Sequence, residues 1–200
     1  MAMQSVEFPI DFKFHIGTLA NDFTATDASG NTIAFVRQKI FKFFDEVQIF
    51  TDSSKSQLLY TIKANKWIDF SATYSFYDAQ GNIIGSVARK GWTSIWKARY
   101  DIFDETKHLS YHIREDNPWT KVGDSFFSEI PLIGIFTGYV FNPSYSVIDN
   151  SGNKIARLKK QASFFGRKFS VEKSKQFVEV DTDRILLSLM MMILLERRRG

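Results

Sequence analysis

The chain has 200 residues, of which 44% are apolar and 24% charged, and its formal net charge is +4. This length and composition are those of an ordinary globular protein with room for a substantial core. Cysteine is absent, which excludes disulfides, thiol nucleophiles and metal sites ligated by cysteine.

The N-terminal stretch MAMQSVEFPIDFKF contains acidic residues and lacks the apolar run of a signal peptide. We therefore expect no export signal and a cytoplasmic location. The chain has twenty Phe, seven Tyr and four Trp. Together with many Val, Ile and Thr, these residues favour β structure.

One turn motif, D-x-x-G-N-x-I, occurs three times, beginning at Asp27, Asp78 and Asp149. The aspartate accepts hydrogen bonds from the backbone further along the turn, and the glycine adopts the left-handed conformation that closes a tight hairpin. Alternating apolar residues precede each motif, which predicts hairpins with a glycine bulge. Two similar units without the glycine lie around Asp52 and Asp104.

A last pair of strand-like runs, KFSVEKSKQFVEV, precedes the C-terminal segment. Six hairpins make about a dozen short strands, and their regular spacing predicts a barrel or a sandwich. Residues 115–142 interrupt this spacing with prolines and glycines, and we expect a loop-rich crossover there with a strand near residues 133–141. No linker divides the chain, so residues 1–200 are predicted to form a single domain.

The stretch DRILLSLMMMILLERRR predicts a helix over about residues 183–197, in which residues 185–195 are apolar except for Ser188. This apolar run rises only ~16 Å, whereas a bilayer core needs about 20 apolar residues, so a membrane span is not expected. Because the helix is apolar on every side, it is predicted to be buried on every side, threaded through the barrel. Polar side chains at residues 181–183 offer N-cap oxygens, and arginines at residues 197–199 suit the helix C-terminus.

The D-x-x-G-N hairpins, the strand KFSVE and the acidic Asp183 at the start of the apolar helix resemble the tubby C-terminal-like superfamily. Within it, the chain is similar to the LURP-one-related and phospholipid-scramblase branch, and the resemblance extends over nearly the whole chain. It implies a mainly β fold, in which a closed antiparallel barrel of about twelve strands encloses one central hydrophobic C-terminal α-helix.

The resemblance implies different activities in different branches. Tubby proteins bind phosphoinositides, scramblases are proposed to scramble lipids in response to calcium, and LURP-one-related proteins have poorly defined roles. This chain lacks the proline-rich arm and the palmitoylated cysteine cluster of scramblases. The scramblase calcium motif places acidic residues before the strand that corresponds to residues 169–172, where this chain has Gly166, Arg167 and Lys168. Calcium-triggered scrambling is therefore not expected.

No metal, cofactor or active site is predicted. Each D-x-x-G-N turn has one carboxylate, too few for a calcium loop. The stretch HLSYHIR alternates, which predicts a strand that separates His108 and His112 by ~13 Å and turns both outward. The chain has no nucleotide-binding or nucleophile-elbow motif. Since a barrel filled by a helix has no lumen for a substrate, we expect the protein not to be an enzyme.

Residues 154–175 carry eight Lys and Arg against one acidic residue, Glu172. Basic residues beside aromatic rings suit an anionic membrane, at ~1 kcal/mol per cation near its surface. We therefore predict a hairpin that binds anionic lipid or phosphoinositide headgroups. Its lipid-binding residues are Lys159, Lys160, Phe164, Phe165, Arg167 and Lys168. The alternative is a solvated basic hairpin whose phenylalanines pack inward.

Two functions of different classes follow. The first is a non-enzymatic, peripheral membrane-binding module. The second is a soluble protein-interaction or scaffold barrel without a lipid ligand, which meets partners at loops such as residues 117–141 with Trp119, Phe126 and Phe127. Nucleic acid is not an expected partner, because a net charge of +4 is modest and no nucleic-acid-binding module is recognisable.

Overall fold

The computed structural model describes residues 3, 5–15, 21–40, 45–65, 72–90, 99–116, 144–161 and 168–197. Within these residues the chain forms twelve strands, a 3₁₀ turn and one α-helix. The strands are β1 (Ile10–Phe14), β2 (Phe23–Thr26), β3 (Thr32–Ile40), β4 (Asp45–Phe50), β5 (Leu58–Asn65), β6 (Thr73–Asp78), β7 (Ile83–Arg89), β8 (Arg99–Phe103), β9 (Leu109–Glu115), β10 (Ser144–Asp149), β11 (Lys154–Gln161) and β12 (Lys168–Lys173). The 3₁₀ turn η2 (Glu179–Asp181) leads directly into α2 (Thr182–Arg197).

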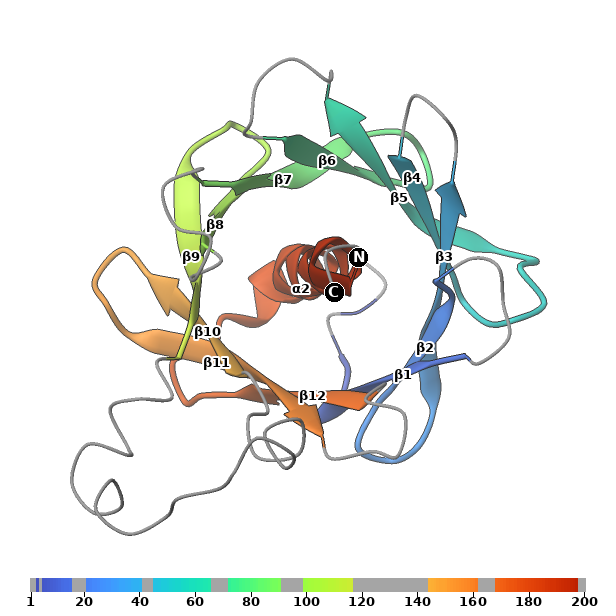
Figure 1. The fold of residues 1–200 in the computed structure, drawn as a ribbon, viewed down its shortest axis with the longest axis horizontal. Coiled ribbons are helices and arrows are strands. Elements are labelled where there is room, and N and C mark those ends of the chain that lie inside the picture. The colour runs from blue at the N-terminus through green and yellow to red at the C-terminus, as the bar shows by residue number, and fades with distance from the viewer. Residues whose placement is uncertain are drawn as a thin grey trace, which may run out of the picture.

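The strands form a closed antiparallel barrel around α2 (Figure 1). Each strand pairs with the next one in the chain, and β1 pairs with β12. At this closure Ile10 lies opposite Val171, and Lys13 lies opposite Lys168. The predicted fold, a twelve-stranded barrel with a central hydrophobic C-terminal helix, is therefore confirmed.

The three D-x-x-G-N turns have one geometry. Asp27 Oδ1 accepts a hydrogen bond from the backbone N–H of Asn31 at 2.8 Å. The Asp27 carbonyl accepts one from the N–H of Gly30 at 3.0 Å, and Gly30 has a φ of +84°. The turns at Asp78 and Asp149 repeat both bonds. The strand register shifts before each turn, as a β-bulge requires.

In the turns at Asp52 and Asp104, lysine occupies the position that glycine has in the other three. Lys55 has a φ of +59° and Lys107 a φ of +68°. A left-handed φ costs a residue with a Cβ about 1–2 kcal/mol. Hydrogen bonds of the turn hold it there: Asp104 Oδ1 accepts the backbone N–H groups two and four residues later at 2.9 and 2.8 Å.

Replacing Lys107 by glycine is expected to raise the free energy of unfolding by about 0.5–1 kcal/mol. Glycine removes the left-handed penalty, and its greater freedom in the unfolded chain offsets only part of that gain. Urea denaturation measures the difference. The matched control is Gly152→Ala in the turn at Asp149, where φ is +89° and the Cβ position is open. This control should lower stability by about 1 kcal/mol. No gain from Lys107→Gly would contradict strain at this turn.

Alternate residues of the wall strands point inward. In β1, Ile10, Phe12 and Phe14 are buried, whereas Asp11 and Lys13 between them are not. The same alternation around the barrel surrounds α2 with apolar side chains. The wall thus supplies an apolar container for a helix that has no polar face.

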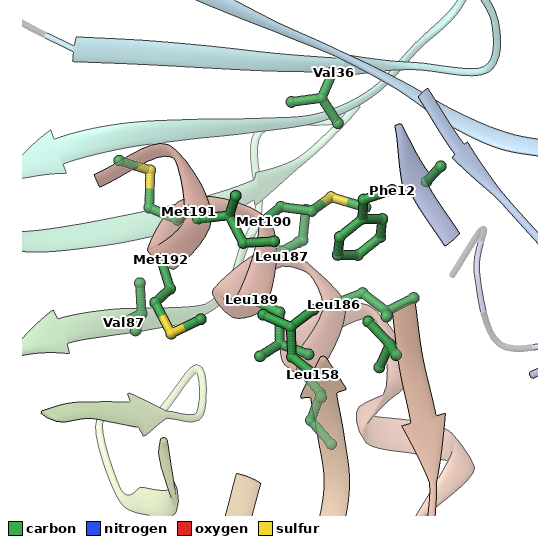
Figure 2. Close-up of a cluster of buried hydrophobic side chains, with 14 of the residues drawn as sticks. Phe12, Val36, Val87, Leu158, Leu186, Leu187, Leu189, Met190, Met191 and Met192 are labelled. Atoms are coloured by element: carbon green, nitrogen blue, oxygen red, sulfur yellow. The ribbon is translucent and has the colours of Figure 1, made fainter. Parts of the chain in front are cut away.

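Residues 185–194 of α2 are all buried. Figure 2 shows Met192 pointing toward Val87 and Leu189 pointing toward Leu158. The exceptional Ser188 donates its hydroxyl to the carbonyl of Arg184 at 2.8 Å, so its polar group is satisfied within the helix. Burying one Leu, Ile or Met side chain stabilises a fold by about 1.5–3 kcal/mol. Ten consecutive buried positions therefore make α2 a central part of the core.

Gly85 in β7 allows close approach between the wall and the start of α2. Its φ is +147°, and a Cβ added there would lie 2.7 Å from the carbonyl oxygen of Phe103 and 3.0 Å from Arg184 Nε. Arg184 Nε donates to the carbonyl of the neighbouring Ile84 at 3.1 Å. The absence of a side chain at Gly85 leaves the space through which the Arg184 side chain passes.

The prediction of a strand pair in KFSVEKSKQFVEV was half wrong. The first run is β12, but residues 177–180 are not a strand. β12 already has β11 on one side and β1 on the other, so a further strand has no edge to join. The chain instead packs Phe177 edge-on against Phe8, with ring centroids 5.1 Å apart, and turns into the barrel through η2. The strand predicted near residues 133–141 lies outside the described residues.

The connections between strands fall at two ends of the barrel. We call one the turn end: residues 5–9, 27–31, 51–57, 78–82, 104–108, 149–153 and 174–184. The strands are joined at the opposite loop end by residues 16–20, 41–44, 66–71, 91–98, 117–143 and 162–167, which lie outside the described residues. The helix α2 starts at the turn end, where Arg184 Nη2 donates to Glu105 at 2.8 Å. It ends toward the loop end, where Tyr100 donates its hydroxyl to Glu196 at 2.5 Å.

Candidate functional site

The barrel closure brings cations from three strands onto one stretch of the outer wall. We call this surface the basic seam: Lys13 on β1, Lys159 on β11 and Lys168 on β12. Lys13 lies directly opposite Lys168 across the β1–β12 pair. Lys13 lies between buried Phe12 and Phe14, Lys159 follows buried Leu158, and Lys168 precedes buried Phe169. Period-two alternation therefore places all three lysines on the outside of the barrel.

Two carboxylates accompany the basic seam. Lys159 Nζ lies 2.7 and 2.8 Å from the two oxygens of Glu172, and Lys168 Nζ lies 4.0 Å from Asp11. These side chains are between 38% and 50% exposed, and exposed pairs of this kind contribute only about 0–1 kcal/mol. The seam therefore has three cations against two weakly held carboxylates, a net charge of +1.

The structure does not bring all the predicted lipid-binding residues together. Lys160 lies opposite Phe169 and follows the inward side of β11, whereas Lys159 is on the outward side. Successive strand residues point to opposite faces, so the two lysines do not share one surface. The other predicted members, Phe164, Phe165 and Arg167, lie outside the described residues. Sequence reasoning missed Lys13, whose place beside Lys168 depends on barrel closure.

A second basic surface lies on the outside of β7, β8 and β9, and we call it the arginine patch: Lys90, Arg99, Asp101, His112 and Arg114. Arg99 lies directly opposite Arg114, and Asp101 directly opposite His112. His112 Nδ1 lies 2.7 Å from Asp101 Oδ1, and Asp101 is only 3% exposed. No residue of this patch was predicted to bind a ligand.

The two histidines at positions 108 and 112 have different surroundings. His112 belongs to β9 and contacts Asp101, whereas His108 precedes the strand and contacts Thr106 at 2.7 Å. Both lie on the outside, as predicted. Within the described part of the chain, no group of three or more His, Asp or Glu side chains is arranged to hold a metal ion.

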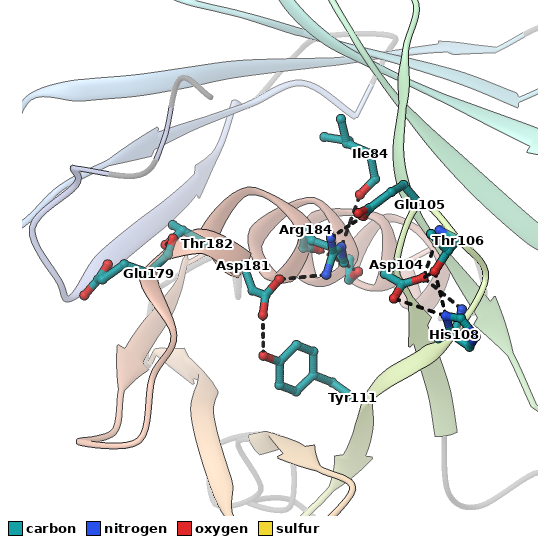
Figure 3. A network of polar contacts seen from close by, with 11 residues as sticks. Ile84, Asp104, Glu105, Thr106, His108, Tyr111, Glu179, Asp181, Thr182 and Arg184 are labelled. Atoms are coloured by element: carbon teal, nitrogen blue, oxygen red, sulfur yellow. Dashed lines mark hydrogen bonds and ion pairs between the residues drawn. The ribbon is translucent and has the colours of Figure 1, made fainter.

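A polar network closes the turn end around the start of α2 (Figure 3). Asp181 accepts hydrogen bonds from Tyr111 Oη at 2.6 Å and from Arg184 Nη1 at 2.7 Å. Burial raises the pKa of the Tyr111 hydroxyl, and its hydrogen bond to Asp181 raises it further. Thr182 donates its hydroxyl to the carbonyl of Glu179 at 2.7 Å. These side chains, expected as N-caps, thus anchor the helix to the wall and to η2.

Asp183 lies inside the barrel at the same end and is 1% exposed. It accepts a hydrogen bond from the backbone N–H of Met3 at 3.0 Å and one from Tyr60 Oη at 2.7 Å. Burial raises the pKa of this carboxyl, and the two hydrogen bonds offset part of that rise. Asp183 therefore joins three distant segments of the chain.

Comparison with known proteins links the chain to one family. Residues 32–195 match the family model described as LURP-one-related. No curated protein and no solved structure matches the chain. Among the helices within the described residues, none has both the length and the apolar character needed to cross a bilayer.

Proposed function

The chain belongs to the LURP-one-related family, and from this premise we propose that it is a non-enzymatic, peripheral membrane-binding module. It recognises anionic lipid headgroups, including phosphoinositides, with the loop end of the barrel and the basic seam beside it. The observation that carries the proposal is the distribution of charge and aromatic residues along the barrel axis.

The turn end is acidic and the rest of the molecule is basic. The turn end holds ten Asp and Glu against four Lys and Arg, a net charge of −6. Because the whole chain carries +4, the remainder of the chain outside the turn end carries +10. A negatively charged bilayer attracts the basic side and repels the turn end, which orients the barrel as it approaches.

Aromatic residues are also distributed unevenly along the chain. The segments that join strands at the loop end contain all four tryptophans and ten of the twenty phenylalanines of the chain. Trp is enriched where proteins meet the headgroup region of a membrane, because its ring is amphipathic. The aromatic content of these segments, together with the basic seam on the neighbouring wall, supports a membrane partner over a free anionic metabolite.

The proposal is a binding module and not an enzyme because α2 occupies the barrel interior. The buried residues of α2 and the inward residues of the wall form one apolar cluster. The titratable groups beside it, such as Asp183 and Arg184, are engaged in hydrogen bonds that hold the helix in place. This filled interior supports binding at the outer surface as the function.

Charge reversal of Lys159, Lys160, Arg167 and Lys168 to Glu is expected to reduce binding to anionic vesicles at least tenfold. Four reversals change the local charge by eight units, and each cation near the surface contributes ~1 kcal/mol. Co-sedimentation with phosphatidylserine or phosphoinositide vesicles at about 0.15 M salt measures this loss of binding.

The matched control reverses four cations at or next to the turn end, Lys55, Lys107, Lys154 and Lys175, and should bind as the wild type does. Wild-type protein that pellets with no vesicle, or loses binding when single-stranded nucleic acid competes, would contradict a membrane function. The first result would favour a protein-interaction scaffold. Binding that survives reversal of the predicted residues would move the site away from the β11–β12 hairpin.

A further inference from the structure

The arginine patch combines two guanidinium groups that face the same way. Arg99 and Arg114 are direct cross-strand neighbours on β8 and β9, and the next residues inward, Tyr100 and Ile113, are fully buried. The backbone N–H of Lys90 donates to the carbonyl of Arg99 at 2.9 Å, which fixes Lys90 beside the pair. Three cations therefore lie next to one another on the outer wall.

A like-charge pair opposite one another weakens a sheet, by a few tenths to 1 kcal/mol. Opposite charges can offset this cost, as where Glu46 lies opposite Lys39 on one side and Lys63 on the other. Arg99 has only a distant carboxylate, with Nε 3.8 Å from Asp101. Among the described residues no ion pair includes Arg114. Contacts among the described residues do not account for this arginine pair.

Asp101 pairs with the cations from a buried position and offsets only one of their three charges. Its Oδ1 contacts His112 at 2.7 Å, and its Oδ2 lies 3.5 Å from Lys90 Nζ. At 3% exposed, Asp101 leaves no carboxylate oxygen to reach outward. Lys90 and Arg99 remain about half exposed, at 57% and 48% of their side chains. With His112 neutral, the patch carries a formal charge of +2.

We infer that Lys90, Arg99 and Arg114 form a binding site for a phosphomonoester group. Such a group carries about −1.5 to −2 charges at neutral pH and three acceptor oxygens, which matches the charge of the patch. The planar guanidinium fork of arginine binds phosphate through two parallel hydrogen bonds. A single carboxylate of a ligand matches the charge less well.

The site deepens the proposed function and rests on it for its natural ligand, a phosphorylated lipid headgroup. Lys90 and Arg99 flank residues 91–98, and Arg114 lies in β9, two residues before Asp116, the last described residue before the segment 117–143. The patch is thus at the edge of the loop end, where a headgroup is presented when that end meets a bilayer. The basic seam supplies general attraction, and the arginine patch supplies selectivity for the phosphate.

The test uses soluble inositol 1,4,5-trisphosphate as a headgroup probe and inorganic phosphate as a free anion, each titrated into the full chain by calorimetry. We expect saturable one-to-one binding of the trisphosphate. The Arg99→Gln/Arg114→Gln variant should bind at least tenfold more weakly. Arg114→Lys, which keeps the charge and loses the fork, should bind several-fold more weakly. A matched control at the turn end, Lys107→Gln/Lys175→Gln, should leave affinity unchanged.

The Arg99→Gln/Arg114→Gln variant replaces exposed side chains and relieves a like-charge contact, so its melting temperature should equal or exceed that of the wild type. Absence of saturable trisphosphate binding, or equal binding by the double-arginine variant, overturns the site. Inorganic phosphate that binds as tightly as the trisphosphate would assign the site to free phosphate and not to a headgroup. Trisphosphate binding without vesicle binding would uphold the site and overturn the membrane function.

Discussion

Substituting Leu189 by aspartate is expected to prevent the protein from folding. Leu189 is fully buried in the middle of α2 and points toward Leu158 of the wall (Figure 2). The surrounding cluster is apolar on every side, so a carboxylate there has neither water nor a hydrogen-bond donor. The effective cost of burying an unpaired charge is several kcal/mol, and the loss of leucine packing adds about 2–5 kcal/mol. Together these costs approach the total stability of an ordinary domain, about 5–15 kcal/mol.

Circular dichroism and size-exclusion chromatography of the variant measure the outcome. Two further variants separate burial from a general sensitivity of the helix. Leu189→Met conserves volume and should cost less than about 1.5 kcal/mol, whereas Leu189→Ala should cost about 2–5 kcal/mol. A folded Leu189→Asp protein with near-native stability would mean that α2 is not enclosed by the barrel.

Replacing Asp183 by alanine is expected to lower the free energy of unfolding by about 2–6 kcal/mol. The change leaves two buried donors without an acceptor, the N–H of Met3 and the hydroxyl of Tyr60, and each such donor costs about 1–3 kcal/mol. Urea denaturation measures the loss. The control Tyr60→Phe removes one donor and its bond together and should cost less than Asp183→Ala. Equal stability of Asp183→Ala and wild type would show that these bonds contribute nothing.

The same carboxyl should leave a signature in the pH dependence of stability. Burial raises the pKa of Asp183 above its ordinary value of 3.8, so the folded state binds a proton more tightly than the unfolded state does. The resulting stabilisation is complete below pH 3.8 and is lost as pH rises through the raised folded-state pKa. The stability of the wild type relative to Asp183→Asn should therefore fall as pH rises from 3.8 through the raised folded-state pKa. An unchanged difference across this window would contradict the raised pKa.

Local chemistry made the wall of the barrel predictable. The aspartate and glycine of each D-x-x-G-N turn specify a hairpin without help from distant residues, and the five turns at Asp27, Asp52, Asp78, Asp104 and Asp149 account for ten strands. The central helix was predictable for a different reason. A short helix without a polar face has to be enclosed, and a dozen strands provide the enclosure.

Long-range pairing was not predictable from local patterns. The runs on either side of Ser174 alternate as a hairpin does, yet β12 pairs with β1, which is distant in the chain. The same closure places Lys13 beside Lys168. The hydrogen bond from Met3 to Asp183 likewise has no local signal, because it depends on where the N-terminal segment meets the finished barrel.

The candidate site was only partly predictable, because part of it also depends on long-range strand pairing. The charge imbalance of residues 154–175 pointed to the basic seam, and period-two alternation already implied that Lys159 and Lys160 face opposite sides. The arginine patch was hidden, because Arg99 and Arg114 become neighbours only through the register of β8 and β9. Each arginine alone resembles any other solvated cation in the sequence.

The closure of β1 on β12 also sets an order of events for the newborn chain. On the ribosome β1 emerges early, while its partner strand and α2 emerge only after the rest of the wall. Until then the partly synthesised sheet has two unpaired edge strands, and its apolar inner face is not yet covered by α2. Such a state is prone to aggregation. A wall that closed without α2 would leave its apolar inner face unfilled, so we expect α2 to pack inside as the last strands close around it. Closure of the barrel therefore depends on contacts between segments distant in the chain, and such contacts make folding slow.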